Sequence, residues 1–159
     1  MEEKNVRLFC VHLDQCDPKK CTALKLKRLG LIQITNRIDK CPRNAIILDP
    51  FADKILSVDD KDSIEKYGLI VIDCSWEKTE SIFKHKFRTG RKLPSLLAAN
   101  SVNYGRWERL SSAEAIAASL FLTGFPENAK NILSKYSWGE SFIQINKFGD
   151  NTADNVENE

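Results

Sequence analysis

The run Leu69-Ile70-Val71-Ile72-Asp73 is the stretch of this sequence that most clearly indicates its fold. Four apolar residues, three of them β-branched, follow one another without a polar interruption and end on an acid. A strand that is buried on both faces of a parallel sheet has this continuous pattern, whereas a half-exposed strand alternates apolar with polar residues. We therefore expect residues 69–73 to form a central strand of a parallel sheet.

The segments before this run alternate between strand and helix patterns. Apolar runs that predict further strands lie at residues 7–13, 31–35 and 45–48. Predicted helices cover residues 59–66, with Gly68 as a stop, and residues 76–86. This alternation is typical of an α/β domain, whose ligands bind beyond the carboxyl ends of the strands. The segments at those ends are residues 14–22, 48–50 and 73–76.

A helix is also predicted over residues 17–30. Asp17 suits its N-cap, and Gly30 suits the position past its end. Cys21, Leu24 and Leu29 give it an apolar stripe. Its remaining side chains are strongly cationic.

The second half of the chain is predicted to be helical from about residue 93 onward. Ser111 with Glu114 forms a capping-box pattern, and Gly124 suits the end of the helix that follows. Two more helices are expected over residues 126–135 and 138–148. The expected organisation is an α/β domain over residues 1–92, a helical domain over 93–148 and an acidic disordered tail over 149–159.

The net charge of +2 conceals a basic body. The last eleven residues hold four acids and no base, so residues 1–148 alone carry +6. Basic residues concentrate in segments 17–30 and 84–92, where they could neutralise the phosphates of a nucleic acid or form solvated faces. The side chains expected to contact RNA phosphates are Lys19, Lys20, Lys25, Arg28, Lys84, Lys86, Arg88 and Arg91.

The chain lacks the marks of membrane proteins and of several enzyme classes. It has no apolar run near 20 residues and no apolar signal core, so we expect a cytoplasmic protein. No P-loop, GxGxxG, GxSxG or HExxH motif is present. The cysteines have irregular spacing and no CxxC pair, so we expect small buried side chains, with no disulfide and no metal. These cysteines are Cys10, Cys16, Cys21, Cys41 and Cys74.

Three side chains near the predicted strand ends could carry chemistry. Trp76 could stack on an adenine or another base, or it could be a core aromatic. Asp73 could be a general base, a ribose contact or a helix N-cap. Thr22, near a helix start, could donate to an anion.

Five blocks of sequence resemble one family in the family's own order. They are residues 13–22, 73–76, 93–105, 110–124 and 135–139. Together they resemble the small-subunit (16S/18S-type) rRNA aminocarboxypropyltransferases of archaea and eukaryotes, and the short chain looks archaeal. The resemblance implies an α/β half with a deep trefoil knot, similar to the SPOUT RNA methyltransferases, and a helical half that completes the donor site.

The resemblance also implies the reaction. The family transfers the 3-amino-3-carboxypropyl group of S-adenosylmethionine to N3 of a pseudouridine, often N1-methylated, in small-subunit rRNA during ribosome biogenesis. Which carbon of the sulfonium transfers depends on which one faces the nucleophile, and no metal is required. The implied partner is small-subunit rRNA or a pre-ribosomal subunit, and we expect a monomer.

Carried over by position, the donor contacts form one set. Thr22 would hold the carboxylate, the backbone of Ile72 would meet the ribose, and Trp76 would cover the adenine and the methyl. The remaining contacts, around the adenine or beside it, are Leu48, Pro50, Leu93, Glu108 and Ser112. Asp73 is the candidate for assisting removal of the N3 proton. Two alternatives stay open: a SPOUT-type RNA methyltransferase, and a non-catalytic rRNA-binding assembly factor.

Overall fold

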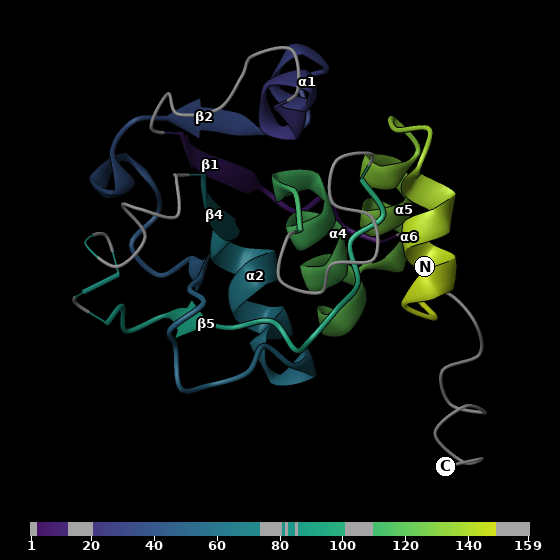
Figure 1. The fold of residues 1–159 in the computed structure, drawn as a ribbon. Coiled ribbons are helices and arrows are strands. Elements are labelled where there is room, and N and C mark those ends of the chain that lie inside the picture. Colours follow the sequence, from purple (N-terminus) through teal and green to yellow (C-terminus); the bar gives the residue numbers. More distant parts are fainter. Residues whose placement is uncertain are drawn as a thin grey trace.

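The computed structural model has a five-stranded parallel sheet with the C-terminal helices packed to one side of it (Figure 1). The structure describes residues 3–12, 21–73, 81, 83, 84, 86–100 and 110–148. The strands, in the order β2-β1-β4-β3-β5 across the sheet, are β1 (Leu8–His12), β2 (Gln33–Thr35), β3 (Ile46–Leu48), β4 (Leu69–Asp73) and β5 (Gly90–Arg91). All four pairings are parallel, so the predicted α/β class and the central position of residues 69–73 are confirmed.

The described helices lie between these strands in the chain and after the last of them. The described ones are α1 (Thr22–Arg28), α2 (Lys61–Tyr67), α4 (Ser112–Thr123), α5 (Pro126–Leu133), α6 (Gly139–Ile145) and the short 3-10 helices η1 (Ile38–Lys40) and η2 (Val58–Asp60). The helices predicted from residues 59, 111, 126 and 138 onward are therefore present, with ends shifted by a few residues.

The ends of α2 and α4 follow the sequence signals. Gly68 has φ 103° and Gly124 has φ 94°, a backbone region that disfavours any side chain. A Cβ on Gly68 would also lie 2.6 Å from the carbonyl oxygen of Arg7, so glycine is required there. At the start of α4, Ser111 Oγ accepts from the Glu114 N–H at 3.2 Å, and Glu114 Oε1 accepts from the Ser111 N–H at 2.9 Å.

The sheet divides the core into two clusters, one on each face. From β4, Leu69 and Val71 belong to the larger cluster and Ile70 to the smaller one, as the alternation of a strand requires. The larger cluster includes residues of α1, α2, α4, α5 and α6, and Figure 1 shows α4 between the sheet and α5. The sheet and the C-terminal helices therefore share one core, while the division into two domains at residue 93 stays a prediction.

The predicted helix over residues 17–30 is corrected at its start, whereas Gly30, with φ 74°, does follow its C-cap as predicted. Residue 21 is the N-cap and α1 begins at Thr22, so a helix start at Asp17 is wrong. Leu29, expected in the apolar stripe, is 49% exposed because α1 ends at Arg28 and Leu29 lies beyond its last turn. Ala23 and Leu26 are the fully buried residues of this helix.

Several predicted segments fall outside the described residues. They include most of the helix at 76–86, the connection at 101–105 and the acidic tail at 149–159. The predicted end of that first helix at residue 86 is wrong, because residues 83, 84 and 86 are not helical. Among the described helices, none has the length and apolar character needed to cross a membrane.

Candidate functional site

Two strands and two helices bring their ends together at the carboxyl edge of the sheet. Strand β1 ends at His12 and β4 ends at Asp73, and these two residues face each other across the parallel pairing. Helix α1 begins at Thr22 and α4 at Ser112, and the hydroxyl oxygen of Thr22 accepts from the N–H of Ala113 at 3.1 Å. The sequence pointed to this edge, and in the structure Thr22 lies beside the start of α4.

Three side chains form a compact polar group here, the His12–Cys21–Asp73 cluster. The Sγ of Cys21 lies 3.5 Å from His12 Nε2 and 3.5 Å from Asp73 Oδ2, and the two latter atoms are 3.8 Å apart. His12 is buried, whereas 22% of the Asp73 side chain is exposed. A carboxylate that is reachable from outside and held from behind by an imidazole and a thiol is suited to accept a proton.

His12 is a member of this site that the sequence did not reveal. It had no visible partner, because its partner Asp73 is 61 residues away in the chain. The available signal was positional. Asp73 ends one predicted strand and His12 is the last residue but one of another, and neighbouring parallel strands place their ends together.

The other described donor-site candidates lie along the same edge. Leu48 ends β3, Pro50 follows two residues later, and Leu93 comes two residues after the end of β5. Because β3 lies between β4 and β5, these residues continue the row that Ile72 begins on β4. Leu48 is buried and Pro50 is exposed, while Ile72 and Leu93 are half-buried. The two remaining candidates, Trp76 and Glu108, lie outside the described residues.

Hydrogen bonds to a buried acid connect the segment after β5 with helix α4. Glu114 is fully buried, and its Oε2 accepts from the backbone N–H groups of Ala99 at 2.5 Å and Asn100 at 3.2 Å. Its Oε1 accepts from Asn100 Nδ2 at 2.7 Å as well as from the Ser111 backbone. The sequence predicted Glu114 only as a capping-box residue, and its second role depends on tertiary contacts.

A hydrogen bond from Tyr136 connects the segment between α5 and α6 with the start of α1. Its hydroxyl donates to the carbonyl oxygen of Thr22 at 2.7 Å, and its ring stacks on Trp138 with centroids 4.7 Å apart. Burial raises the pKa of the Tyr136 phenol well above its ordinary value, and the nearby Cys21 raises it further, against a smaller opposing effect of Arg28. Tyr136 is therefore a neutral donor at physiological pH.

The expected phosphate contacts divide into inward and outward side chains. The ammonium of Lys25 donates to the carbonyl oxygen of Lys135 at 2.5 Å and lies 4.8 Å from the Tyr136 ring centroid. Arg91 pairs with Asp60 at 3.0 Å, and both side chains are largely buried. The four that are exposed are Arg28, Lys84, Lys86 and Arg88, of which Lys86 pairs with Asp53 and Arg88 donates to Asn44. Lys19 and Lys20 lie outside the described residues.

Within the described residues, His12, Cys21 and Asp73 could also offer ligands to a metal ion. One donor atom from each lies within 4.8 Å of the other two. Imidazole, thiolate and carboxylate suit Zn²⁺, but the thiol here already lies 3.5 Å from both the imidazole and the carboxylate. The expectation of no metal stays a prediction.

Comparison with known families gives two matches. A family described as "Ribosome biogenesis protein, C-terminal" matches residues 46–150. A family described as "Possible Fer4-like domain in RNase L inhibitor, RLI" matches residues 6–40.

The second match raises the question of an iron–sulfur cluster, which commonly takes four cysteine ligands. Residues 6–40 contain three cysteines, and Cys10 among them is completely buried in the larger core cluster. Cys41, just beyond, packs in the smaller cluster on the opposite face of the sheet. The described cysteines therefore do not fit such a cluster.

Individual proteins are similar over nearly the whole chain. A 16S rRNA aminocarboxypropyltransferase from Methanosarcina mazei is 44% identical over 92% of this chain and 84% of that protein. One from Thermoplasma acidophilum is 45% identical over 89% of this chain and 86% of that protein. Among solved structures, the SAM-dependent rRNA:acp-transferase Tsr3 from Vulcanisaeta distributa matches with a TM-score of 0.85 and 40% identity, covering 91% of this chain and 80% of the other.

Proposed function

This chain belongs to the family of the 16S rRNA aminocarboxypropyltransferases, and we propose that it transfers the 3-amino-3-carboxypropyl group of S-adenosylmethionine to N3 of a pseudouridine in small-subunit rRNA. The observation that carries the proposal is the 40–45% identity to relatives of that name over about nine tenths of the chain. The partner is small-subunit rRNA or a pre-ribosomal subunit, and the acceptor is the base with or without a prior N1-methyl group.

The carboxyl edge of the sheet has the character that the donor needs. Thr22 offers a hydroxyl and a backbone N–H to the donor carboxylate at one end of this edge. Ile72 would meet the ribose through its backbone, and Leu48 and Pro50 would flank the adenine together with Trp76. The backbones of Leu93 and Glu108 and the start of α4 at Ser112 would complete the site.

Selectivity for the aminocarboxypropyl group would follow from presentation. When bound, S-adenosylmethionine supplies a sulfonium whose aminocarboxypropyl carbon bonds to N3 of the base as the carbon–sulfur bond breaks. Trp76 would cover the methyl group, and Thr22 would hold the carboxylate end, so that the reacting carbon faces the acceptor. Orientation of this kind requires fixed side chains rather than a covalent intermediate.

Asp73 would take the N3 proton. Its carboxylate is partly exposed, whereas His12 behind it is buried. His12 and Cys21 would hold the carboxylate in one orientation, which makes them positioning residues. A base with a fixed position contributes typically about 100-fold or more to the rate of such a step.

The exposed cations would contact rRNA phosphates. Arg28, Lys84, Lys86 and Arg88 are exposed, and Lys19 and Lys20 precede α1 in the sequence. Lys25 and Arg91 donate to groups inside the protein. To contact a phosphate, Lys25 would have to leave the carbonyl oxygen of Lys135 and Arg91 the carboxylate of Asp60.

The knot, the oligomeric state and the cellular location of the protein are proposals as well. We propose that the sheet domain carries the deep trefoil knot of SPOUT-like proteins and that the helical domain completes the donor site. We further propose that the protein acts as a monomer in the cytoplasm and that its acidic tail takes no part in catalysis.

A labelled donor tests the reaction. The protein is mixed with small-subunit rRNA and S-adenosylmethionine labelled either in the carboxyl carbon or in the methyl group. We expect label to enter RNA from the carboxyl carbon alone. Entry from the methyl alone would identify an RNA methyltransferase, and RNA binding without entry of either label would identify a non-catalytic assembly factor.

A further inference from the structure

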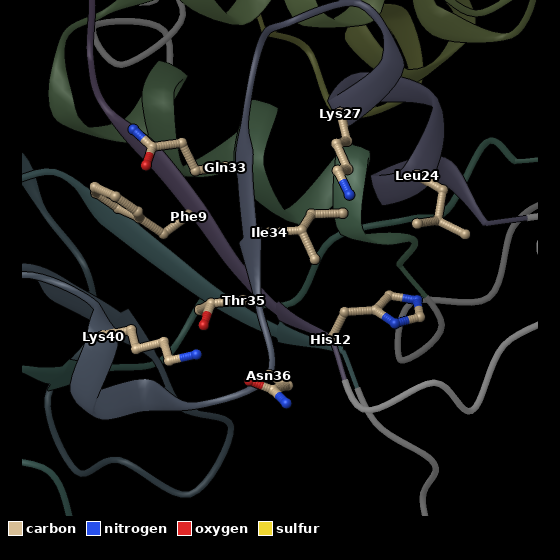
Figure 2. A pocket seen from close by; sticks show the side chains of 9 residues that line it. All are labelled: Phe9, His12, Leu24, Lys27, Gln33, Ile34, Thr35, Asn36 and Lys40. Atoms are coloured by element: carbon tan, nitrogen blue, oxygen red, sulfur yellow. The ribbon is translucent and has the colours of Figure 1, made fainter.

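A pocket of about 490 Å³ follows the free edge of the sheet beside β2, and we call it the β2 pocket (Figure 2). Its lining comes from β1, α1, β2, η1 and the residue after β2: Phe9, His12, Leu24, Lys27, Gln33, Ile34, Thr35, Asn36 and Lys40. None of these residues belongs to the proposed donor contacts. The volume lies within the range of roughly 300–1,000 Å³ that small-molecule pockets occupy.

The charge of the β2 pocket is positive. Its lining includes two lysines and no acid. Figure 2 shows the ammonium groups of Lys27, from α1, and Lys40, from η1, pointing toward the pocket from opposite sides with Ile34 and Thr35 between them. Both lysines are exposed, and within the described part of the chain neither has a carboxylate at salt-bridge distance. Two ammonium groups that line one pocket from opposite sides of β2 suit successive phosphates of a nucleic-acid backbone.

The remaining lining suits a nucleobase. Leu24 and Ile34 offer an apolar surface on the α1 side of β2, and Phe9 offers one on the other side. The side-chain amides of Gln33 and Asn36 each carry donors and acceptors that can pair with a base edge. Proteins that recognise single-stranded RNA commonly combine such contacts to bases with contacts to the phosphates.

The β2 pocket lies next to the proposed reaction site. His12 lines the pocket, and its Nε2 lies 3.8 Å from the carboxylate of Asp73. A ligand in the pocket would therefore lie next to the base that we propose for the reaction.

We propose that the β2 pocket binds one nucleotide of the rRNA adjacent to the acceptor base, with Lys27 and Lys40 each on one of the two phosphates that flank it. This inference rests on the proposed function, because it takes the acceptor to be RNA. The pocket positions the RNA, while the edge formed by β3, β4 and β5 holds the donor.

Binding measurements on a double variant test the proposal. Lys27→Ala/Lys40→Ala removes both ammonium groups and leaves the buried core untouched. Its charge-matched control is Lys66→Ala/Lys130→Ala, which alters exposed residues of α2 and α5. Affinity for transcribed small-subunit rRNA is measured over a series of salt concentrations, and affinity for S-adenosylmethionine is measured by calorimetry.

We expect the pocket variant to bind rRNA about tenfold more weakly and to lower the slope of log affinity against log salt by about 2 relative to the wild type. Donor affinity should stay unchanged. When the transcript contains 4-thiouridine, light should cross-link it to the peptide of residues 21–40 in the wild type. Free uridine monophosphate, the second probe, should compete only at much higher concentration, because it lacks the flanking phosphates.

The outcomes separate this inference from the proposed function. If the pocket variant matches the control in affinity, salt slope and cross-linking, the β2 pocket is not an RNA site. Equal competition by uridine monophosphate and by RNA would instead indicate a site for free nucleotides and overturn the proposal. If the wild type transfers no label but the pocket variant still loses rRNA affinity, the proposed reaction fails and the RNA site stands.

Discussion

The Nε2 atom of His12 lies 3.8 Å from Oδ2 of Asp73, because β1 and β4 pair in parallel with these two residues opposite each other. The thiol of Cys21, at the N-cap of α1, lies 3.5 Å from both atoms. The ends of two strands and the start of one helix thus bring an imidazole and a thiol to one carboxylate, at the edge of the sheet where the donor is proposed to bind.

Asp73→Asn tests the role of this carboxylate. The amide keeps the shape of the side chain but is a far weaker proton acceptor, so we expect the single-turnover rate of transfer to fall about 100-fold or more. Donor affinity should change less than about threefold, since Asp73 is not among the donor contacts. Rapid-quench kinetics with labelled donor and calorimetry measure the two quantities.

His12→Gln is the matched variant for this prediction. It removes the imidazole behind Asp73 but leaves the carboxylate, so the rate should fall less than in Asp73→Asn. A rate in Asp73→Asn equal to that of the wild type would contradict a role as proton acceptor.

Thr22 is expected to matter for donor affinity. Thr22→Val removes the hydroxyl that would hold the donor carboxylate and that accepts from Ala113 N at 3.1 Å. The loss of a hydrogen bond to a charged group costs about 1.5–3 kcal/mol, so the Kd for S-adenosylmethionine should rise by at least about tenfold. Thr22→Ser keeps the hydroxyl and should bind nearly as well as the wild type. If Thr22→Val and Thr22→Ser bound the donor equally, the hydroxyl would not hold the carboxylate.

Glu114→Gln should destabilise the fold. Each carboxylate oxygen of Glu114 accepts two hydrogen bonds, and a glutamine would place an amide NH₂ group against one pair of donors. We expect the free energy of unfolding to fall by about 3 kcal/mol, as measured by denaturant titration. Glu127→Gln, on the exposed surface of α5, should change it by less than about 0.5 kcal/mol. Equal effects of the two variants would show that the buried network does not stabilise the protein.

Because the pKa of Tyr136 is raised, we expect the free energy of unfolding to depend on pH in the alkaline range. The folded protein binds the phenol proton more tightly than the unfolded chain does, because the pKa of Tyr136 is raised on folding. The stability that Tyr136 contributes is therefore complete below about pH 10 and falls as the pH rises above it. Tyr136→Phe lacks this titration and should cost about 1 kcal/mol near neutral pH through loss of the bond to Thr22.

The measurement is the difference in unfolding free energy between the wild type and Tyr136→Phe as a function of pH. This difference should be constant up to about pH 10 and should shrink between about pH 10 and about pH 11.5. A difference that is constant over this range would contradict a raised pKa.

Local patterns in the sequence predicted most of the elements. The apolar run at residues 69–73 identified the central strand, and the capping box at Ser111 with the stop at Gly124 bounded α4. These signals depend on residues close together in the chain. Leu29 was placed wrongly because a helical periodicity does not state where the helix ends, and α1 ends one residue before it.

Contacts between distant segments were beyond local patterns. The pairing of His12 with Asp73 depends on which strands are neighbours in the sheet. The inward direction of Lys25 and Arg91 depends on Lys135 and Asp60, which lie 110 and 31 residues away. The donor contacts came from the resemblance of the sequence blocks, and their roles stay predictions.

The by-product of the reaction tests the central claim most directly. The protein is incubated with small-subunit rRNA and S-adenosylmethionine, and the nucleosides left from the donor are separated by chromatography. Transfer of the aminocarboxypropyl group leaves 5′-methylthioadenosine, so this compound should appear in proportion to the rRNA modified. Appearance of S-adenosylhomocysteine in its place would show that the methyl group is transferred and would contradict the account.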